Sequence, residues 1–226
     1  MVQPLKLVMF DFDGTLVDSQ AAIVAAMREA FVGAGRPPPA AGAVKRVVGL
    51  HLEAAVGALA PQADSAAVAD MAEGYRRAFF RLRSRPDHEE PVFPGARAVL
   101  RALEEAQVLL GIATGKNRRG LLASLERHEL GGHFTVLKTA DDGPGKPHPG
   151  ILERAMSELG VEPRDTVMVG DTVFDMEMAR NARARAVGVS WGYHEPGELA
   201  EAGAHRVIDS FEDLLPVLSE LDIAAI

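Results

Sequence analysis

The fold is decided by Leu7-Val8-Met9-Phe10-Asp11-Phe12-Asp13-Gly14-Thr15-Leu16, an apolar run that ends abruptly in two carboxylates and a glycine. An apolar run without a turn signal predicts a strand that is buried on both faces, as in a parallel sheet. Buried charge is costly unless something compensates it. We therefore place Asp11 and Asp13 at the carboxyl end of this strand, where open parallel sheets bind their ligands.

The two carboxylates can converge on one site if the chain turns sharply at Gly14, and Thr15 can donate its hydroxyl or cap that turn. Two unit charges about 4 Å apart repel by roughly 4 kcal/mol at an effective dielectric constant near 20. A cation would relieve this repulsion, and hard carboxylate oxygens favour Mg²⁺. Considered alone, Asp13-Gly14 fits an ordinary turn at the end of a strand equally well.

Composition excludes several classes of protein. The chain has 226 residues, enough for one large domain or for a domain with a sizeable insertion. Its net charge of -8 argues against a nucleic-acid partner but not against a small phosphorylated substrate. The absence of cysteine excludes disulfides, thiolate metal sites and cysteine nucleophiles. The N-terminus lacks the form of a signal peptide and no apolar run approaches a membrane span, so we expect a cytoplasmic protein. We also expect a monomer or a homodimer.

Residues 18–90 show helical patterning and no convincing strand. We expect helices at about 20–34, 42–48, 52–59 and 65–82, the first of them with Ser19 as its N-cap. The charged, proline-bounded stretch Arg85–Pro91 is typical of a hinge or linker. These residues therefore predict an inserted helical cap domain (18–90) that lies above the carboxylates, whereas residues 1–17 and 91–226 form the core domain.

Beyond Pro94 the pattern changes to alternating helices and strands. Strands are expected at 108–113, 134–139, 166–170, 186–190 and 206–208. Helices are expected at about 96–106, 118–128, 174–182 and 211–221, with another that ends at 159. This alternation predicts an α/β fold with a Rossmann-like parallel sheet that is covered on both faces.

Polar residues follow four of these strands, and because the carboxyl ends of parallel strands share one edge they should converge there. The residues are Asp11, Asp13, Thr114, Lys146, Asp171 and Asp175. One carboxylate can attack phosphorus, and a second can act as acid and then as base. A divalent ion and a lysine would offset the charge, while a hydroxyl and backbone N–H groups would hold the phosphoryl oxygens.

Four motifs in order resemble those of the haloacid dehalogenase superfamily. They are Asp11-Phe12-Asp13-Gly14-Thr15-Leu16-Val17-Asp18-Ser19, Thr114, Gly145-Lys146-Pro147 and Gly170-Asp171-Thr172-Val173-Phe174-Asp175. Within that superfamily the chain is similar to the phosphoglycolate phosphatase-like and β-phosphoglucomutase-like members, which carry a helical cap after the first strand.

This resemblance implies a Mg²⁺-dependent phosphatase that hydrolyses a small phosphorylated metabolite, such as a phosphoglycolate-like ester, through an aspartyl phosphate. It implies that Asp11 is the nucleophile, that Asp13 is the general acid/base, and that Lys146 offsets charge on the nucleophile and the phosphate. Thr114 would bind the phosphate. Because the dehalogenating branch lacks an aspartate at the position of Asp13, this residue favours phosphoryl transfer.

The metal site implied by the resemblance consists of Asp11, the backbone carbonyl of Asp13, and Asp171, with Asp175 supporting the metal shell. For each of these residues an ordinary structural role is the alternative. Asp171 could cap a helix, and Asp175 could stabilise a helix N-terminus.

Substrate contacts are expected from Gly115 and Lys116 and from the helical insertion. Relatives often have asparagine where this chain has Gly115, so only its backbone N–H can serve the phosphate. Asn117 is expected as a helix N-cap and His148 as a loop residue. The stretch Val47–His51 resembles the cap loop that dips towards the active site; there Lys45, Arg46 and His51 either meet the leaving group or form a solvated helix face.

A sugar-phosphate mutase of the β-phosphoglucomutase type is the alternative to a phosphatase, since it uses the same site and the same kind of cap. Nothing in the motif spacing tells whether water or a sugar hydroxyl accepts the phosphoryl group.

Overall fold

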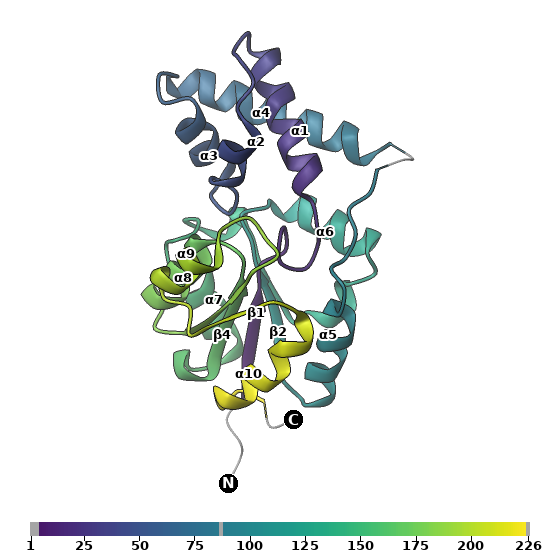
Figure 1. Cartoon of the computed structure of the whole chain (residues 1–226), viewed down its shortest axis with the longest axis vertical. Coiled ribbons are helices and arrows are strands. Elements are labelled where there is room, and N and C mark those ends of the chain that lie inside the picture. Colours follow the sequence, from purple (N-terminus) through teal and green to yellow (C-terminus); the bar gives the residue numbers. More distant parts are fainter. Residues whose placement is uncertain (1–4, 86–87, 225–226) are drawn as a thin grey trace.

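The computed structural model describes residues 5–85 and 88–224, and its centre is a parallel sheet in the order β3-β2-β1-β4-β5-β6 (Figure 1). The strands are β1 (Leu7–Phe10), β2 (Leu109–Ala113), β3 (Val136–Lys138), β4 (Thr166–Gly170), β5 (Arg185–Val189) and β6 (Arg206–Ile208). The α/β fold expected from the sequence is confirmed. Residues 1–4 and 225–226 of the expected core domain, and Pro86-Asp87 of the expected linker, lie outside the described residues.

Strand β1 lies in the middle of the sheet, between β2 and β4. Leu7 and Met9 belong to the apolar cluster on one face of the sheet, and Val8 and Phe10 to the cluster on the other. Both sets are fully buried, which is why the strand is an uninterrupted apolar run. The strand order reverses direction at β1, and the carboxyl end of such a strand is where open α/β sheets form their ligand crevice.

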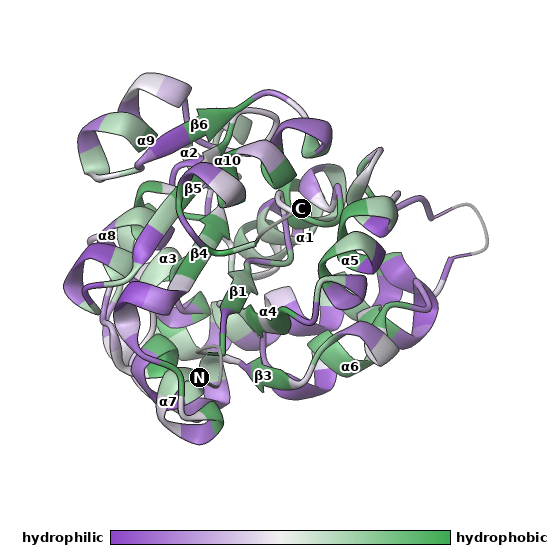
Figure 2. Ribbon diagram, turned by 90° about the horizontal axis from the view of Figure 1, so that it is seen from below, coloured by the Kyte–Doolittle hydropathy of each residue, from purple (hydrophilic) through white to green (hydrophobic). Residues whose placement is uncertain are grey.

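Helices cover both faces of the sheet. One apolar cluster contains residues of α5 (Ala96–Glu105), α6 (Arg118–Arg127) and α10 (Leu214–Glu220). The opposite cluster contains residues of α7 (Gly150–Leu159), α8 (Val173–Asn181) and α9 (Pro196–Ala202). Figure 2 shows the hydrophobic strands in the centre and the hydrophilic residues on the outer surfaces of the helices. No helix of the described residues has the length and apolar character needed to cross a membrane.

Four helices follow β1 and lie beyond the carboxyl ends of the strands (Figure 1). They are α1 (Gln20–Gly33), α2 (Ala41–Lys45), α3 (Leu52–Leu59) and α4 (Ser65–Arg83). They have an apolar cluster of their own, which includes Met27, Phe31, Val56 and Met71. As expected, the described residues of this segment contain no strand.

Three expectations about elements were wrong. Helix α2 ends at Lys45 rather than Val48, because turns at residues 46–50 lead the chain down towards the sheet. Strand β3 has only three residues instead of six. Helix α9 was missed, because Pro196-Gly197 looks like a turn; the proline instead occupies the first turn of a helix, whose N-terminus is closed by a capping box between Glu195 and Glu198.

Packing around the central strands can be tested at Gly111. A Cβ atom there would collide with the side chains of Met9 and Val136, so Gly111→Ala should lower the free energy of unfolding by about 1–3 kcal/mol. Urea denaturation measures the change as a lower midpoint. Gly57→Ala in α3 is the matched control, because its Cβ would meet no atom within 4 Å and alanine favours the helix. An unchanged midpoint for Gly111→Ala would contradict the packing described here.

Candidate active site

Asp11 is the first residue beyond β1 and is buried. Its backbone N–H donates to the carbonyl of Val169 at 2.9 Å, which continues the sheet pairing and directs the side chain to the carboxyl edge. Its Oδ1 accepts a hydrogen bond from the N–H of Phe12 at 2.7 Å, and its Oδ2 lies 2.9 Å from Nζ of Lys146. The carboxylate is thus fixed by one backbone donor and one cation.

Lys146 lies between two carboxylates in the interior. Its Nζ is 2.9 Å from Oδ2 of Asp11 and 2.5 Å from Oδ1 of Asp175, and all three side chains are buried. Burial by itself would lower the pKa of Lys146, but the carboxylates of Asp11 and Asp175 outweigh it and hold that pKa above its ordinary value. The lysine therefore remains a cation at neutral pH.

Asp171 follows β4 and is held by two donors from other loops. The hydroxyl of Thr15 donates to its Oδ1 at 2.8 Å, and the N–H of Tyr193 donates to its Oδ2 at 2.9 Å. Gly14 has φ +85°, and a side chain at this position would collide with Asp171 and Tyr193. The glycine of the first motif is thus required both by the turn and by the close approach of Asp171.

Three carboxylates meet at this point and fit a divalent cation. One oxygen each of Asp11, Asp171 and Asp175 lies within 4.8 Å of the others. Burial raises the pKa of Asp11 to about 6, and burial together with Asp11 and Asp175 raises that of Asp171 well above its ordinary value. Such mutual repulsion is what a hard cation with oxygen ligands relieves.

Asp175 joins this cluster, while the carboxylate of Asp13 does not. Oδ2 of Asp175 accepts from the N–H and the hydroxyl of Thr172 at 3.1 and 2.7 Å, which completes the N-terminal capping box of α8. The same side chain thus caps a helix and faces Lys146. The expected contribution of Asp13 to the metal through its backbone carbonyl stays a prediction.

The Asp13 carboxylate faces the helical segment. Its Oδ1 accepts a hydrogen bond from Ser19 at 2.7 Å, and its Oδ2 lies 3.0 Å from Nζ of Lys116. Ser19 was expected to cap α1, but its hydroxyl makes no capping bond and is used on Asp13 instead. Nζ of Lys116 also lies 4.8 Å from the centre of the Phe79 ring in α4, so this lysine contacts both parts of the chain.

Thr114 directly follows β2 and lines the same cleft as Asp11, Asp13, Gly115 and Lys116. The Thr114 backbone pairs with Lys138 of β3, and its Oγ1 accepts from the N–H of Lys116 at 3.3 Å. Among the described residues none accepts a hydrogen bond from this hydroxyl, which can therefore donate to an anion. Asn117 caps α6 by accepting from Gly120 at 2.7 Å, and His148 accepts from Gly150 at 3.0 Å within its loop, as predicted.

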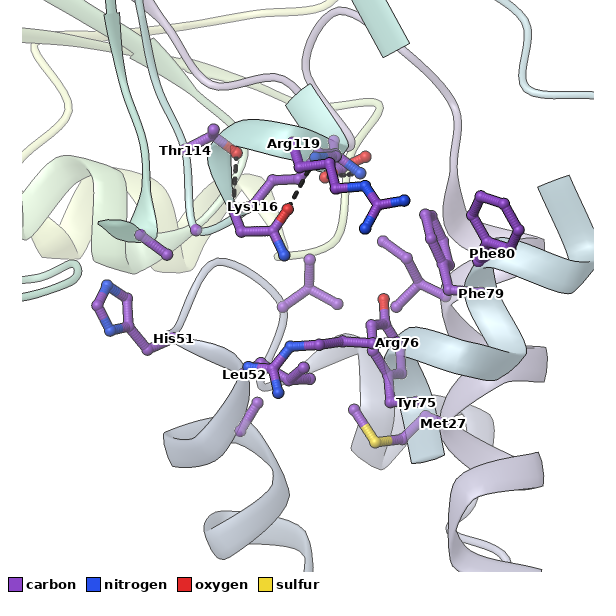
Figure 3. Close-up of a pocket in the computed structure, with 18 of the residues that line it drawn as sticks. Met27, His51, Leu52, Tyr75, Arg76, Phe79, Phe80, Thr114, Lys116 and Arg119 are labelled. Atoms are coloured by element: carbon purple, nitrogen blue, oxygen red, sulfur yellow. Dashed lines mark hydrogen bonds and ion pairs between the residues drawn. The ribbon is translucent and has the colours of Figure 1, made fainter. Parts of the chain in front are cut away.

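The stretch Val47–His51 descends onto the sheet edge, as expected (Figure 3). A Cβ atom on Gly115 would lie 2.9 Å from the carbonyl oxygens of Gly49 and Leu50, and one on Gly145 would collide with the ring of His51. Two glycines of the core thus make room for this loop.

Of the three side chains singled out near that loop, only His51 lines the cleft. Arg46 pairs instead with Glu198 of α9 at 2.6 Å, and this contact raises the pKa of Arg46 and lowers that of Glu198.

The loop Trp191–His194 was missed by the sequence analysis. It follows β5 at the same sheet edge, where Tyr193 supports Asp171 and the indole N–H of Trp191 donates to the carbonyl of Thr15 at 3.1 Å. Its position directly after a strand, like that of the other motifs, was the available signal. Arg76, Arg77 and Arg83 of α4, which the sequence analysis did not assign to the site, also line the cleft.

Comparison with known proteins finds a family and several similar chains. The model of the family described as haloacid dehalogenase-like hydrolase matches residues 8–189. The chain is 36% identical to the probable phosphatase IndB of Dickeya dadantii over 92% of this chain and 91% of that protein. It is 34% identical to the phosphoglycolate phosphatase of Pseudomonas putida over 93% of this chain and 79% of the other. The crystal structure of a hydrolase from Pseudomonas syringae superposes with a TM-score of 0.85 at 30% identity, over 96% and 99% of the two chains.

The raised pKa values of Asp11 and Asp171 predict how a Mg²⁺ ion bound by this cluster would stabilise the protein. A carboxyl whose pKa is raised on folding stabilises the fold at low pH, and the pKa of about 6 for Asp11 means that this contribution is lost between about pH 4 and pH 6. Mg²⁺ must bind the deprotonated form, so its stabilising effect should increase over the same range. At a concentration of about 100 times its Kd, the metal should raise the free energy of unfolding by roughly 2.7 kcal/mol at about pH 8. The increase should be clearly smaller near pH 5.

Thermal unfolding with and without Mg²⁺ at the two pH values measures this difference. Asp165→Asn is the control, since Asp165 is a buried carboxylate paired with Lys6 outside the cluster. The control should keep the Mg²⁺ effect. A Tm shift that is the same at both pH values would contradict the prediction.

Proposed function

Because the chain belongs to the haloacid dehalogenase-like hydrolases and is a phosphoric monoester hydrolase, we propose that it is a Mg²⁺-dependent phosphatase acting through an aspartyl phosphate on Asp11. The substrate proposed is a small phosphorylated metabolite of the phosphoglycolate type, that is, a phosphate ester whose leaving group carries an acid. The relatives that are named as phosphoglycolate phosphatases support this substrate class.

The observation that carries the proposal is the position of the buried Lys146 beside Asp11, whose carboxylate lines the cleft. A carboxylate that attacks a phosphate must approach another anion, and a fixed cation lowers the cost of that approach. The ammonium of Lys146 is buried, protonated and within 2.9 Å of the nucleophile. The hydroxyl of Thr114 accepts from the N–H of Lys116 and would donate its proton to a phosphoryl oxygen.

The chemistry then divides between the two aspartates of the first motif. A carboxylate oxygen of Asp11 forms a bond to phosphorus while the bond from phosphorus to the ester oxygen breaks. Asp13 gives its proton to that ester oxygen, and then takes a proton from the water that attacks the aspartyl phosphate. Inorganic phosphate leaves, and Asp11 returns as a carboxylate. Ser19 and Lys116, which contact the Asp13 carboxylate, would hold it in position.

Asp11 and Asp171 would hold the metal, together with the backbone carbonyl of Asp13, and Asp175 would support this shell from the end of α8. A bound Mg²⁺ would neutralise part of the negative charge that these groups and the phosphate bring together.

Residues 18–90 would act as a cap domain on the core formed by residues 1–17 and 91–226. The two connections between them lie side by side, because Val17 bridges to Val92 and the N–H of Asp18 donates to the carbonyl of Pro91 at 2.9 Å. A paired crossing of this kind is suited to a hinge, through which the cap opens for substrate and product.

Asp11→Asn should remove phosphatase activity, with kcat reduced at least about a thousandfold, because the amide cannot form the acyl phosphate. Phosphate release from a panel of phosphomonoesters, including 2-phosphoglycolate, in the presence of Mg²⁺ measures this loss. Asp18→Asn is the control, an exposed carboxylate seven positions further on. Undiminished turnover by Asp11→Asn would exclude Asp11 as the nucleophile, and isomerisation of β-glucose 1-phosphate without phosphate release would favour a mutase.

Asp171→Asn should raise the Mg²⁺ concentration at half-maximal activity by about tenfold or more, because a ligand is lost while the nucleophile remains. The Mg²⁺ titration of activity measures it, at saturating ester. A half-maximal concentration equal to that of the unaltered enzyme would remove Asp171 from the metal site.

A further inference from the structure

The size of the cleft bears on the leaving group of the substrate. The cleft has a volume of about 1230 Å³ and extends from Asp11, Asp13 and Thr114 to the C-terminal end of α4. Sites for drug-sized ligands occupy about 300–1,000 Å³. A leaving group of two carbons would fill only the end of this cleft next to Asp11, so most of its wall would contact nothing.

This hollow is not closed by the loop that already rests on the core. The carbonyl oxygens of Gly49 and Leu50 pack so closely on Gly115 that a Cβ atom there would lie only 2.9 Å from them. Arg46 of the helical segment also pairs with Glu198 of the core. The cap is therefore seated at the end where α2 and α3 meet the sheet. The space that remains lies between α4 and the N-terminus of α6 (Figure 3).

The charge of the cleft differs from that of the whole molecule. The chain has a net charge of -8, but six arginines and Lys116 line the cleft against five carboxylates. Arg119 points into it from α6 (Figure 3), and within residues 5–85 and 88–224 no ion pair or side-chain hydrogen bond involves it. The N-terminus of α6 is already satisfied, because the side chain of Asn117 accepts from the N–H of Gly120 and the carboxylate of Asp141 accepts from the N–H of Arg118. The guanidinium of Arg119 is therefore the positive group that this helix offers to the cleft.

The wall opposite Arg119 is aromatic. Tyr75 and Phe79 of α4 are stacked, with ring centres 5.6 Å apart and an angle of 16° between their planes. Phe80 follows them along the cleft and is 65% exposed, which is unusual for so large an apolar side chain. A flat ring can be buried against these side chains while an acid on it meets Arg119.

From the cleft's size, its aromatic wall and the unpaired Arg119, we propose that the substrate is a phosphomonoester whose leaving group contains a flat ring with a second anionic group. The ring lies along Phe79 and Phe80, and the second anion binds Arg119. This inference rests on the proposed function for the position of the phosphate, and it extends that function by naming the class of leaving group.

Three probes separate the contributions of the ring and of the acid. Ribose 5-phosphate has neither, uridine 5′-monophosphate adds a flat ring, and orotidine 5′-monophosphate adds one carboxylate to that ring. Calorimetry with the Asp11→Asn variant in Mg²⁺ measures their affinities without turnover. We expect affinity to increase at each step, the carboxylate adding about tenfold, as hydrogen bonds to a charged group typically do.

Arg119→Ala in the same background should reduce the affinity ratio of the two nucleotides to about one, and Phe80→Ala should reduce the gain from ribose 5-phosphate to uridine 5′-monophosphate. Arg118→Ala is the matched control, because Arg118 is adjacent, exposed and directed to Asp142 and Leu137 outside the cleft. It should leave all three affinities unchanged.

The proposal is overturned if orotidine 5′-monophosphate binds no more tightly than uridine 5′-monophosphate, if ribose 5-phosphate equals both, or if Arg118→Ala acts as Arg119→Ala does. Phosphate release by the unaltered enzyme is measured separately. If affinity increases from ribose 5-phosphate to orotidine 5′-monophosphate but no phosphate is released, the phosphatase function is contradicted and the inference about the cleft stands. If phosphate is released but affinity does not increase in this order, the phosphatase function stands and the inference about the cleft is contradicted.

Discussion

The burial of one lysine between two aspartates is the constraint on which the rest of the site depends. Lys146 lies 2.9 Å from Asp11 and 2.5 Å from Asp175, with no bulk solvent to screen any of these charges. A buried ion is expensive unless it is paired and hydrogen-bonded. The remaining oxygens are accordingly satisfied by backbone N–H groups and by Thr172, so that the charges are held by three separate loops.

The same edge of the sheet also fixes how the helical segment meets the core. Small residues decide this contact, because Gly115 and Gly145 leave the space that the loop at Gly49–His51 occupies. Charged contacts add to it, since Arg46 pairs with α9 and Lys116 lies between Asp13 and the ring of Phe79. A movement of the helical segment would therefore change the contacts that Ser19 and Lys116 make with the Asp13 carboxylate. Opening of the cleft would thus also shift a carboxylate that takes part in the proposed reaction.

The sequence pattern predicted secondary structure well where a segment is uniformly buried. It predicted less well where one residue type is compatible with two local structures. The apolar run at β1 and the alternation after Pro94 gave the parallel sheet, because a strand buried on both faces leaves few polar positions. No helix was predicted at Pro196–Ala202, because a Pro-Gly pair is typical of a turn although proline equally starts a helix. Ser19 is a residue type that caps helices, but its hydroxyl donates to the carboxylate of Asp13 instead.

By itself, the sequence determined the fold class, the insertion of helices after the first strand, and the polar residues at the strand ends, because each depends on local order and spacing. Only the tertiary structure decided which of those residues meet: that Asp175 rather than the Asp13 carboxylate joins Asp11 and Asp171, that Tyr193 supports Asp171, and that Arg119 faces an aromatic wall. These contacts join residues that are far apart in the chain, as Asp11 and Asp175 are. Their distances are set by how the sheet and the helices pack, and spacing along the chain does not contain that information.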